Sequence, residues 1–259
     1  MFQWFSKLFR KPALPSVAAI EWPVGIESAP VRIVAGGLTA VAPAYYSGWP
    51  GDCPGCDLDA KRIFAVATIS GAQGIRAENV QCTKQGAINA VRRAAKGMKP
   101  DDLLIIYYSG HGGQTPDVNG DEPDGLDETL CLWDGQLSDD VIAEMLCELP
   151  TYARVFFMTD CCNSRSLARS VPPVVSAMES ASASFRCQVV HFAGCDDGKS
   201  SFGGCDGGVF TNAFLASLKP GITYRQMANE ISAKMPKNQP AFFTGYNTTD
   251  DFWNREIFK

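Results

Sequence analysis

One segment sets the architecture expected of this 259-residue chain, LLIIYYSGHGG at residues 103–113. Its first part, Leu103–Tyr108, is an unbroken apolar and aromatic run that lies between two aspartates and a Ser-Gly turn. A short apolar run between turn-forming residues is typical of a central parallel strand that is covered on both faces. We therefore predict a buried strand here, followed directly by a loop that carries His111.

Similar runs follow at Val155–Met158 and Val189–Ala193, and Val31–Ala35 predicts an earlier strand. Val80–Thr83 suggests a further short strand, whose last residue can cap the next helix. Helical spacing separates these runs, and it covers residues 57–67, 84–96, 138–149, 208–218 and 223–234. Alternating strands and helices predict an α/β fold with a mainly parallel central sheet and helices on both faces.

The composition fits a single globular domain, because 46% of the residues are hydrophobic and 20% are charged. A net charge of −5 and a pI near 5.1 argue against nucleic acid as a partner. No run reaches the roughly 18 apolar residues that a membrane span needs. The ten cysteines have irregular spacings, so we expect a reducing cytoplasm rather than a disulfide framework.

Two smaller features, a cysteine pair and the N-terminal segment, allow more than one interpretation. Cys53 and Cys56 form a Cys-x-x-Cys pair, but neither histidine lies at a zinc-ligand spacing from it, which disfavours structural zinc. Residues 1–11 mix aromatic and basic side chains. This segment could make peripheral membrane contact as an amphipathic helix, dock a partner, pack on the domain or be a frayed terminus.

Candidate catalytic residues follow the two strongest predicted strands. His111 lies in a Gly-rich turn after the first, and Cys161 and Cys162 follow Asp160 after the second. Active sites of parallel sheets collect at the carboxyl ends of the strands, so we expect these loops to lie side by side. Hydrolysis by a cysteine nucleophile requires a histidine beside the cysteine, because the thiolate is the nucleophile and an ordinary thiol is mostly protonated at neutral pH.

Other interpretations of these residues have less support. A lone histidine is more often structural, and a cysteine pair is more often buried in a core. A nucleotide-binding domain is disfavoured, because there is no Gly-x-x-x-x-Gly-Lys-Ser/Thr loop and no Gly-x-Gly-x-x-Gly after the first strand. A serine hydrolase is disfavoured because the sequence has no Gly-x-Ser-x-Gly elbow.

Several blocks of the sequence, in the same order, resemble those of metacaspases and related prokaryotic caspase homologues. The blocks lie within Val31–Gly245 and comprise residues 108–112, 120–128 and 160–164, with further matches at 55–60, 193–197 and 207–214. The resemblance implies a caspase-like three-layer α/β sandwich. It implies one peptidase domain over residues 31–259, after an N-terminal extension at 1–30. This domain would comprise a large-subunit-like part (31–165), a connecting loop (166–186) and a small-subunit-like part (187–259).

The same resemblance assigns catalytic roles. Cys162 matches the nucleophile and His111 its dyad partner, while Cys161 is only a neighbour. The oxyanion hole would use the backbone N–H groups of Gly112 and Cys162. These matches imply a cysteine endopeptidase that requires no cofactor.

Metacaspases cleave after Arg or Lys, and the positions that match their acidic specificity pocket are Asp59, Ser109 and Asp160. Two carboxylates that face a guanidinium would favour protein or peptide substrates with Arg or Lys before the cleaved bond. The alternative is that Asp59 caps a helix and Asp160 merely ends a strand.

The segment from Asp117 to Asp140 holds nine carboxylates and no Lys or Arg. It is either a solvated loop or a site where a cation offsets the repulsion, and calcium is the hard cation that suits oxygen ligands. The resemblance to calcium-dependent metacaspases matches Asp127, Asp139 and Asp140, whereas the fourth position falls near Arg169, which cannot ligate a cation. Calcium is therefore a candidate activator.

The turn at the nucleophile departs from the family pattern, since Asn163 replaces a histidine and Arg165 replaces a glycine. This leaves a second hypothesis, a catalytically silent homologue that binds a partner through the same groove. The connecting loop offers Arg165, Arg169 and Arg186 as sites of self-cleavage. The family resemblance further implies a monomer.

Overall fold

The computed structural model describes residues 20–117, 120, 125–161, 185–195 and 203–259. Within these residues, one sheet has six strands in the order β11-β8-β7-β3-β1-β2. Neighbouring strands are parallel except at the edge, where β11 is antiparallel to β8. The strand bounds are Val31–Gly37 (β1), Gln73–Glu78 (β2), Leu103–Ser109 (β3), Arg154–Asp160 (β7), Gln188–Ala193 (β8) and Phe242–Tyr246 (β11). The predicted mainly parallel sheet is confirmed.

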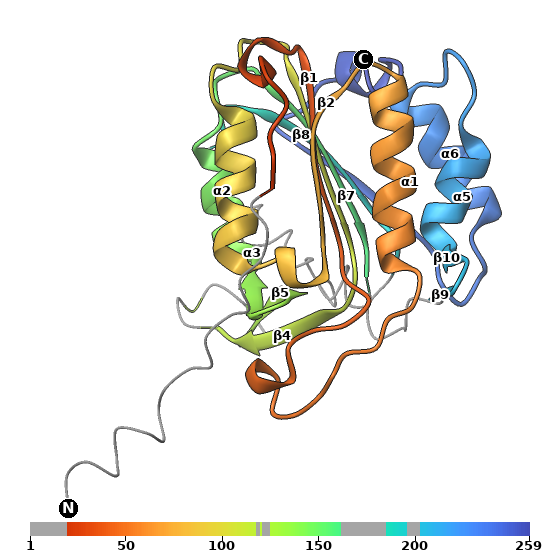
Figure 1. Ribbon diagram of the computed structural model, residues 1–259. Helices are drawn as coiled ribbons and strands as arrows, with labels where there is room; N and C mark the ends of the chain where they lie inside the picture. Colours follow the sequence, from red (N-terminus) through yellow and green to blue (C-terminus); the bar gives the residue numbers. More distant parts are fainter. Residues whose placement is uncertain (1–19, 118–119, 121–124, 162–184, 196–202) are drawn as a thin grey trace, which may run out of the picture.

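Helices cover both faces of this sheet, with α1, α5 and α6 on one face and α2 and α3 on the other (Figure 1). Their bounds are Cys56–Ile69 (α1), Lys84–Ala95 (α2), Asp139–Cys147 (α3), Val209–Ser217 (α5) and Tyr224–Lys234 (α6), and a short α7 spans Asp250–Trp253. Thr83 caps α2 as predicted, since its Oγ1 accepts a hydrogen bond from Gly86 N at 3.0 Å. The expected three-layer α/β sandwich is confirmed.

Strand β3 contributes side chains to both cores, which explains its unbroken apolar run. Leu103, Ile105 and Tyr107 pack in the core beneath α1, α5 and α6, whereas Leu104 and Tyr108 pack in the core beneath α2 and α3. Alternate residues of a strand point to opposite faces, so a strand that is covered on both faces has to be apolar at nearly every position.

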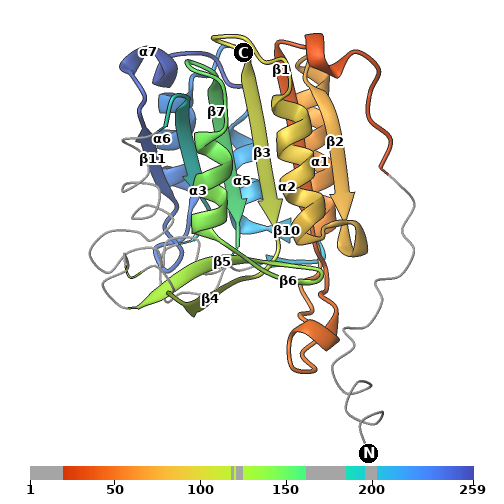
Figure 2. The same ribbon diagram turned by 90° about the vertical axis from the view of Figure 1, so that its left-hand side faces the viewer.

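A second, three-stranded antiparallel sheet lies at the carboxyl edge of the first (Figure 2). It comprises β4 (Gly112–Pro116), β5 (Leu126–Leu132) and β6 (Gly135–Ser138). The interpretation of the acidic segment as a solvated loop is wrong for this part, because Asp127 and Glu128 are buried within β5. The many carboxylates of the segment favoured a solvated loop, although β5 also contains leucines and a cysteine.

Both edge strands of the main sheet differ from expectation. The predicted strand at Val80–Thr83 is wrong, since Asn79–Gln81 is a single 3-10 turn and the strand β2 precedes it. An edge strand tolerates charged residues, so β2 gives no apolar run to detect. On the opposite edge, β11 is a strand that the sequence pattern did not indicate.

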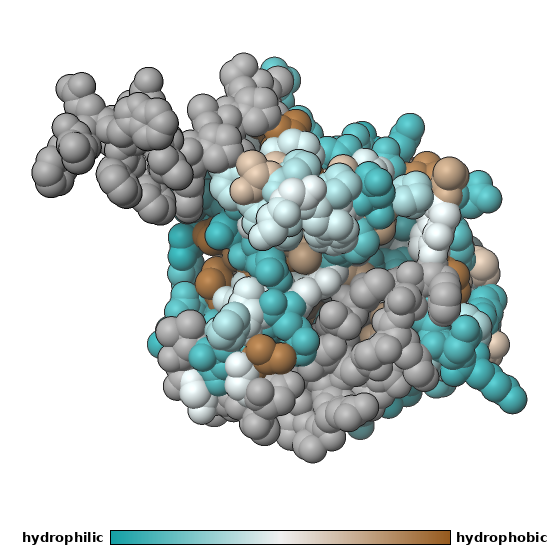
Figure 3. Space-filling model, turned by 90° about the horizontal axis from the view of Figure 1, so that it is seen from below, coloured by the Kyte–Doolittle hydropathy of each residue, from teal (hydrophilic) through white to brown (hydrophobic). Residues whose placement is uncertain are grey.

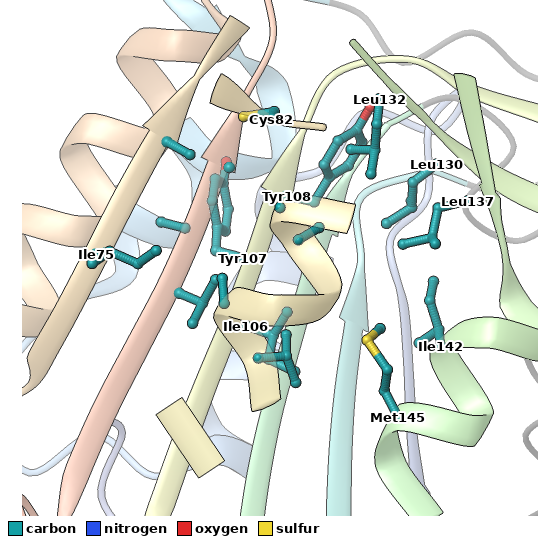
Figure 4. Close-up of a pocket in the computed structure, with 18 of the residues that line it drawn as sticks. Ile75, Cys82, Ile106, Tyr107, Tyr108, Leu130, Leu132, Leu137, Ile142 and Met145 are labelled. Atoms are coloured by element: carbon teal, nitrogen blue, oxygen red, sulfur yellow. The ribbon is translucent and has the colours of Figure 1, made fainter. Parts of the chain in front are cut away.

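A cavity of about 80 Å³ remains in the core between the sheet and helices α2 and α3 (Figure 4). Its walls are almost entirely apolar, with Ile106, Leu130 and Met145 among them. An apolar cavity of this kind stays dry. It contains none of the predicted site residues, so the chemistry has to lie elsewhere.

Among the described residues, no helix is both long and apolar enough to cross a membrane. Strand β1 begins at Val31, where the predicted peptidase domain begins. Residues 1–11 and most of the connecting loop at 166–186 lie outside the described residues. The division of the domain into two subunit-like parts therefore stays a prediction.

Candidate active site

The carboxyl ends of β3 and β7 lie next to each other at one edge of the sheet. In the strand register Ser109, the last residue of β3, pairs with Asp160, the last residue of β7. Gly110 N also donates a hydrogen bond to Asp160 O at 3.3 Å. The loops that follow the two strands therefore begin side by side, as the sequence predicted.

The nucleophile and the oxyanion hole stay predictions. Cys162 lies two residues after Asp160, outside the described residues, and so do Asn163 and Arg165. Gly112, the other residue expected in the oxyanion hole, is the first residue of β4 and directly follows the predicted dyad histidine.

His111 is held by contacts from three directions. Its carbonyl accepts hydrogen bonds from the Tyr108 hydroxyl at 2.8 Å and from Cys131 N at 2.9 Å. Its ring packs against Trp49, with ring centroids 4.7 Å apart, and its Nε2 lies 3.3 Å from Asp52 O. The imidazole is therefore fixed in orientation while it remains partly exposed.

The contact with Asp52 determines which ring nitrogen carries the proton. A carbonyl oxygen only accepts, so Nε2 of His111 donates and Nδ1 keeps its lone pair. This tautomer suits a general base, because Nδ1 can take a thiol proton while the carbonyl stabilises the imidazolium that forms.

The second histidine, His191, has a structural role. It is 1% exposed, its Nε2 hydrogen-bonds to Thr159 Oγ1 at 3.1 Å, and its ring stacks on Phe157. Burial lowers the pKa of His191 to about 3, so the ring is neutral at physiological pH. Of the two histidines in the chain, only His111 lines the pocket at this edge of the sheet.

A pocket of about 170 Å³ opens beside His111 at this edge of the sheet. Asp59, Ser109 and Asp160 all line it, so the structure brings together the residues predicted to select the substrate. The alternative role of Asp59 as a helix cap is wrong, because the N-cap of α1 is Gly55. Figure 3 looks onto this edge of the molecule, where most of the coloured side chains are hydrophilic.

Close packing of α1 against β1 brings Asp59 to the pocket. Gly37 permits this approach, since a Cβ there would lie 2.5 Å from Cys56 O. Asp59 Oδ2 accepts hydrogen bonds from Ser109 Oγ at 3.1 Å and Gly208 N at 2.8 Å. Asp59 Oδ1 is buried and has no hydrogen-bond partner among the described residues. A buried acceptor of this kind favours a ligand that donates to it.

Asp160 is held by the first turn of α5. Its Oδ2 accepts hydrogen bonds from Thr211 N at 3.0 Å and Thr211 Oγ1 at 2.6 Å. Because the Thr211 hydroxyl gives its hydrogen to Asp160, the Tyr107 hydroxyl has to donate to Thr211 Oγ1, at 2.6 Å. The N-terminal end of a helix also stabilises negative charge. These contacts fix the carboxylate in one orientation.

The two carboxylates of the pocket repel each other. Burial, and then the charge of Asp160, raises the pKa of Asp59 to about 7. The hydrogen bonds from Gly208 and Ser109 and the charge of Arg62 oppose that rise. A bound cation would favour the ionised form of Asp59.

Sequence reasoning missed four residues that support the site. Trp49 and Asp52 lie in the loop before α1, which was recognised only by its glycines and prolines. The contact between the Asp52 carbonyl and His111 could not be predicted from sequence spacing, because the two residues lie far apart in the chain. Gly208 and Thr211 fall in the block at 207–214, at the start of a predicted helix, and the N-terminal end of a helix is a place where a carboxylate is stabilised.

Replacing Gly208 with alanine is expected to damage the pocket, whereas Gly204→Ala is not. A Cβ on Gly208 would lie 2.2 Å from Asp160 Oδ2, but one on Gly204 meets nothing within 4 Å. The φ of Gly208 is −73°, which any residue adopts, so space alone decides the outcome. We expect Gly208→Ala to lower the free energy of unfolding by roughly 1–3 kcal/mol. Denaturant unfolding of both variants measures this, and equal stabilities would contradict the packing.

The three carboxylates matched to a calcium site do not form a metal-binding group. Among the described residues, no three His, Cys, Asp or Glu side chains lie where they could hold a metal ion together. Asp127 is buried in β5, and Asp139 Oδ1 accepts a hydrogen bond from Asp140 N at 3.0 Å at the start of α3. Calcium activation stays a prediction.

The chain is similar to a known protein family and to several known proteins. A family model described as "Caspase domain" matches residues 40–252. Metacaspase-3 of Arabidopsis thaliana is 31% identical over 198 residues, which cover 65% of this chain and 54% of that protein. Metacaspase-1 of Schizosaccharomyces pombe is 41% identical over 87 residues, which cover 32% of this chain and 20% of that protein. The matched region is thus about half or less of the length of these relatives.

Two solved structures resemble the fold. Protein GSU0716 of Geobacter sulfurreducens has a TM-score of 0.75 and 30% sequence identity, and the match covers 88% of this chain and 97% of that chain. Caspase-1 of Spodoptera frugiperda has a TM-score of 0.56 and 12% identity, and the match covers 90% of this chain and 93% of that chain. At 12% identity, the second likeness concerns the fold alone.

Proposed function

This chain belongs to the caspase domain family, whose model matches residues 40–252, and we propose that it is a cysteine endopeptidase that cleaves after Arg or Lys. In this proposal Cys162 is the nucleophile and His111 is its proton partner. The pocket between Asp59 and Asp160 receives the basic side chain that precedes the cleaved bond.

The observation that carries the proposal is the acidic pocket beside His111. Asp59 and Asp160 are both buried at its walls, and none of its described lining residues is Lys or Arg. A guanidinium presents several N–H donors in a fixed plane, so it can satisfy carboxylate oxygens from two sides. Oδ1 of Asp59, which has no hydrogen-bond partner among the residues that the structure describes, is one acceptor that such a side chain would use.

The proposed reaction uses the tautomer that Asp52 favours. Nδ1 of His111 takes the thiol proton of Cys162, and the thiolate attacks the carbonyl carbon of the substrate. Backbone N–H groups of Gly112 and Cys162 hold the negative charge that develops on the carbonyl oxygen. The imidazolium then protonates the leaving amine, and water hydrolyses the thioester.

Hydrolysis of matched fluorogenic peptides that end in Arg, Lys or Asp tests this proposal directly. We expect turnover of the Arg and Lys peptides and none of the Asp peptide, because the pocket is acidic. Selective turnover of the Asp peptide would overturn the specificity. Tight binding without any turnover would favour the alternative of a catalytically silent, partner-binding homologue.

The same assay decides whether calcium is an activator. Peptide turnover is measured with a calcium chelator and again after calcium is restored in excess. A reversible loss of turnover would support calcium as an activator that draws on the acidic segment. Equal turnover in both conditions would remove calcium from the proposal.

Binding of an Arg side chain is expected to tighten as the pH rises through the pKa of Asp59, which burial raises to about 7. Below this pKa Asp59 is neutral and the pocket attracts a cation less; above it Asp59 is ionised and attraction increases. The dissociation constant of agmatine, an alkylguanidinium, should fall by about tenfold between roughly pH 6 and 8. This corresponds to a change of about one unit in the pKa of Asp59 when agmatine binds. Titration calorimetry on the Cys162→Ala variant measures it without turnover.

The matched control for the pH dependence is Asp59→Asn in the same Cys162→Ala background. This substitution removes the titrating carboxyl but keeps the size of the side chain. We expect weaker agmatine binding that no longer changes with pH. An undiminished pH dependence in the control would assign the titration to another group.

The remaining expectations about the whole protein stay predictions. They are a monomeric state, a cytoplasmic location, self-cleavage in the connecting loop and a peripheral membrane contact through residues 1–11. Of the three candidate cleavage sites, Arg186 is described and its side chain is exposed, but its carbonyl accepts a hydrogen bond from Tyr152 N at 2.8 Å. That bond would have to open before cleavage after Arg186.

A further inference from the structure

Two thiols that the proposed reaction does not use lie in contact on the wall of the pocket. Cys53 Sγ and Cys56 Sγ are 2.7 Å apart, and both residues line the pocket beside His111. The turn between them is closed by Gly55, whose φ of +92° suits glycine. The sulfurs therefore need to approach by only a fraction of an ångström to reach the bonded distance of about 2.05 Å.

The two cysteines differ in the way that a redox-active pair requires. Cys53 is half-buried and precedes α1, whereas Cys56 is 6% exposed and is the first residue of α1. The hydrogen bond between the sulfurs lowers the pKa of Cys53, while the same bond, followed by burial, raises the pKa of Cys56. Cys53 is thus the accessible thiol with the greater thiolate fraction, and Cys56 is the protected one.

We propose that Cys53 and Cys56 form a reversible disulfide by exchange with a small-molecule disulfide such as oxidised glutathione. The Cys53 thiolate attacks one sulfur of that disulfide and releases the first glutathione thiol, which takes up the proton that Cys53 has lost. Cys56 then attacks the sulfur of Cys53, loses its own proton and releases the second glutathione thiol. Two protein thiols are oxidised and one disulfide is reduced to two thiols, so atoms and electrons balance.

The disulfide would fasten the loop before α1 to the start of that helix. Cys53 directly follows Asp52, whose carbonyl orients His111, and Cys53 N donates a hydrogen bond to Thr39 O at 2.8 Å. The pair therefore couples the redox state of the surroundings to a loop that contacts the candidate dyad. In a reducing compartment such a bond is transient, which is the behaviour of a redox sensor rather than of a structural staple.

The test is to map free thiols in the full-length Cys162→Ala variant, which removes the predicted nucleophile. The protein is equilibrated in glutathione buffers of increasing oxidised-to-reduced ratio, quenched, alkylated after unfolding and digested with trypsin. Both cysteines lie on one tryptic peptide, residues 33–61, and the exposed reference Cys205 lies alone on residues 200–225, because trypsin does not cleave between Lys219 and Pro220. We expect the first peptide to carry no alkyl group, and to be two hydrogens lighter than its reduced form, at a ratio at least about tenfold below that which modifies Cys205, because its second step is intramolecular.

Two single variants separate the steps of the exchange. With Cys56→Ser, Cys53 should stop at a mixed disulfide with glutathione, because no second thiol can release it. With Cys53→Ser, the buried Cys56 should remain alkylatable after unfolding. The proposal is overturned if the 33–61 peptide keeps both alkyl groups in buffers where Cys205 is fully modified. A stable mixed disulfide on Cys53 with Cys56 present would overturn it as well. Neither readout depends on peptidase activity, so failure here leaves the proposed function untouched.

Discussion

Replacing Cys162 with alanine is expected to abolish peptide cleavage, whereas Cys161→Ala should retain most of it. Without a thiolate the covalent route is closed, so kcat for the Arg peptide should fall by at least about 10⁴-fold, as it does when other hydrolases lose their nucleophile. Cys161 is only 1% exposed and packs in the core beneath α2 and α3. We therefore expect the Cys161 side chain to contribute to core packing and not to catalysis. Steady-state hydrolysis by the two variants measures the contrast.

These neighbouring substitutions control for each other, because each removes one sulfur from one of two consecutive residues. Cys161→Ala should lower the free energy of unfolding by roughly 1 kcal/mol, through loss of a buried atom. It should lower kcat/KM by less than about tenfold. The reverse ranking, in variants that both fold by circular dichroism, would place the nucleophile one residue earlier.

The Asp160→Asn substitution is expected to lower kcat/KM for the Arg peptide by roughly 10²- to 10³-fold, which is typical when a buried ion pair loses one charge. The amide oxygen can still accept the hydrogen bonds from Thr211 N and Thr211 Oγ1, so the local fold should persist. The charge is lost while the shape is kept. The measurement is kcat/KM for paired peptides that end in Arg or in citrulline, its uncharged isostere.

The citrulline peptide shows whether the effect of Asp160→Asn comes from charge. Its kcat/KM should be low with the wild type and change little in the variant, because no cation is bound. Ser109→Ala provides a milder comparison, since it removes only one of the two hydrogen bonds to Asp59 Oδ2. Equal losses for the Arg and citrulline peptides would show that Asp160 supports folding or catalysis rather than recognition of charge.

The central fold and much of the pocket were predictable because their signals are local. A strand buried on both faces has to be apolar throughout, so Leu103–Tyr108 was evident without any partner. Parallel pairing then placed Ser109 beside Asp160, since the carboxyl ends of adjacent parallel strands share an edge. The place of Asp59 came from family resemblance and not from periodicity.

The features that were missed depend on contacts between distant parts of the chain. Strand β5 is buried although it carries Asp127 and Glu128, because the second sheet surrounds it. Its leucines and Cys131 are only a weak local signal, which the surrounding carboxylates outweigh. The Asp52 carbonyl contacts His111 across 59 positions of sequence. Because every residue has a backbone carbonyl, the identity of residue 52 does not indicate this contact.

The pocket is shared between two portions of the chain that flank residues 162–184. Asp59 and Asp160 come from the portion before this segment, while Gly208 and Thr211, which donate hydrogen bonds to them, come from the portion after it. Strands β7 and β8 join the portions through parallel pairing. Neither fragment can present the proposed recognition site alone. The two fragments, expressed as separate polypeptides, would recover guanidinium binding only by complementation, which makes that binding a reporter of their association.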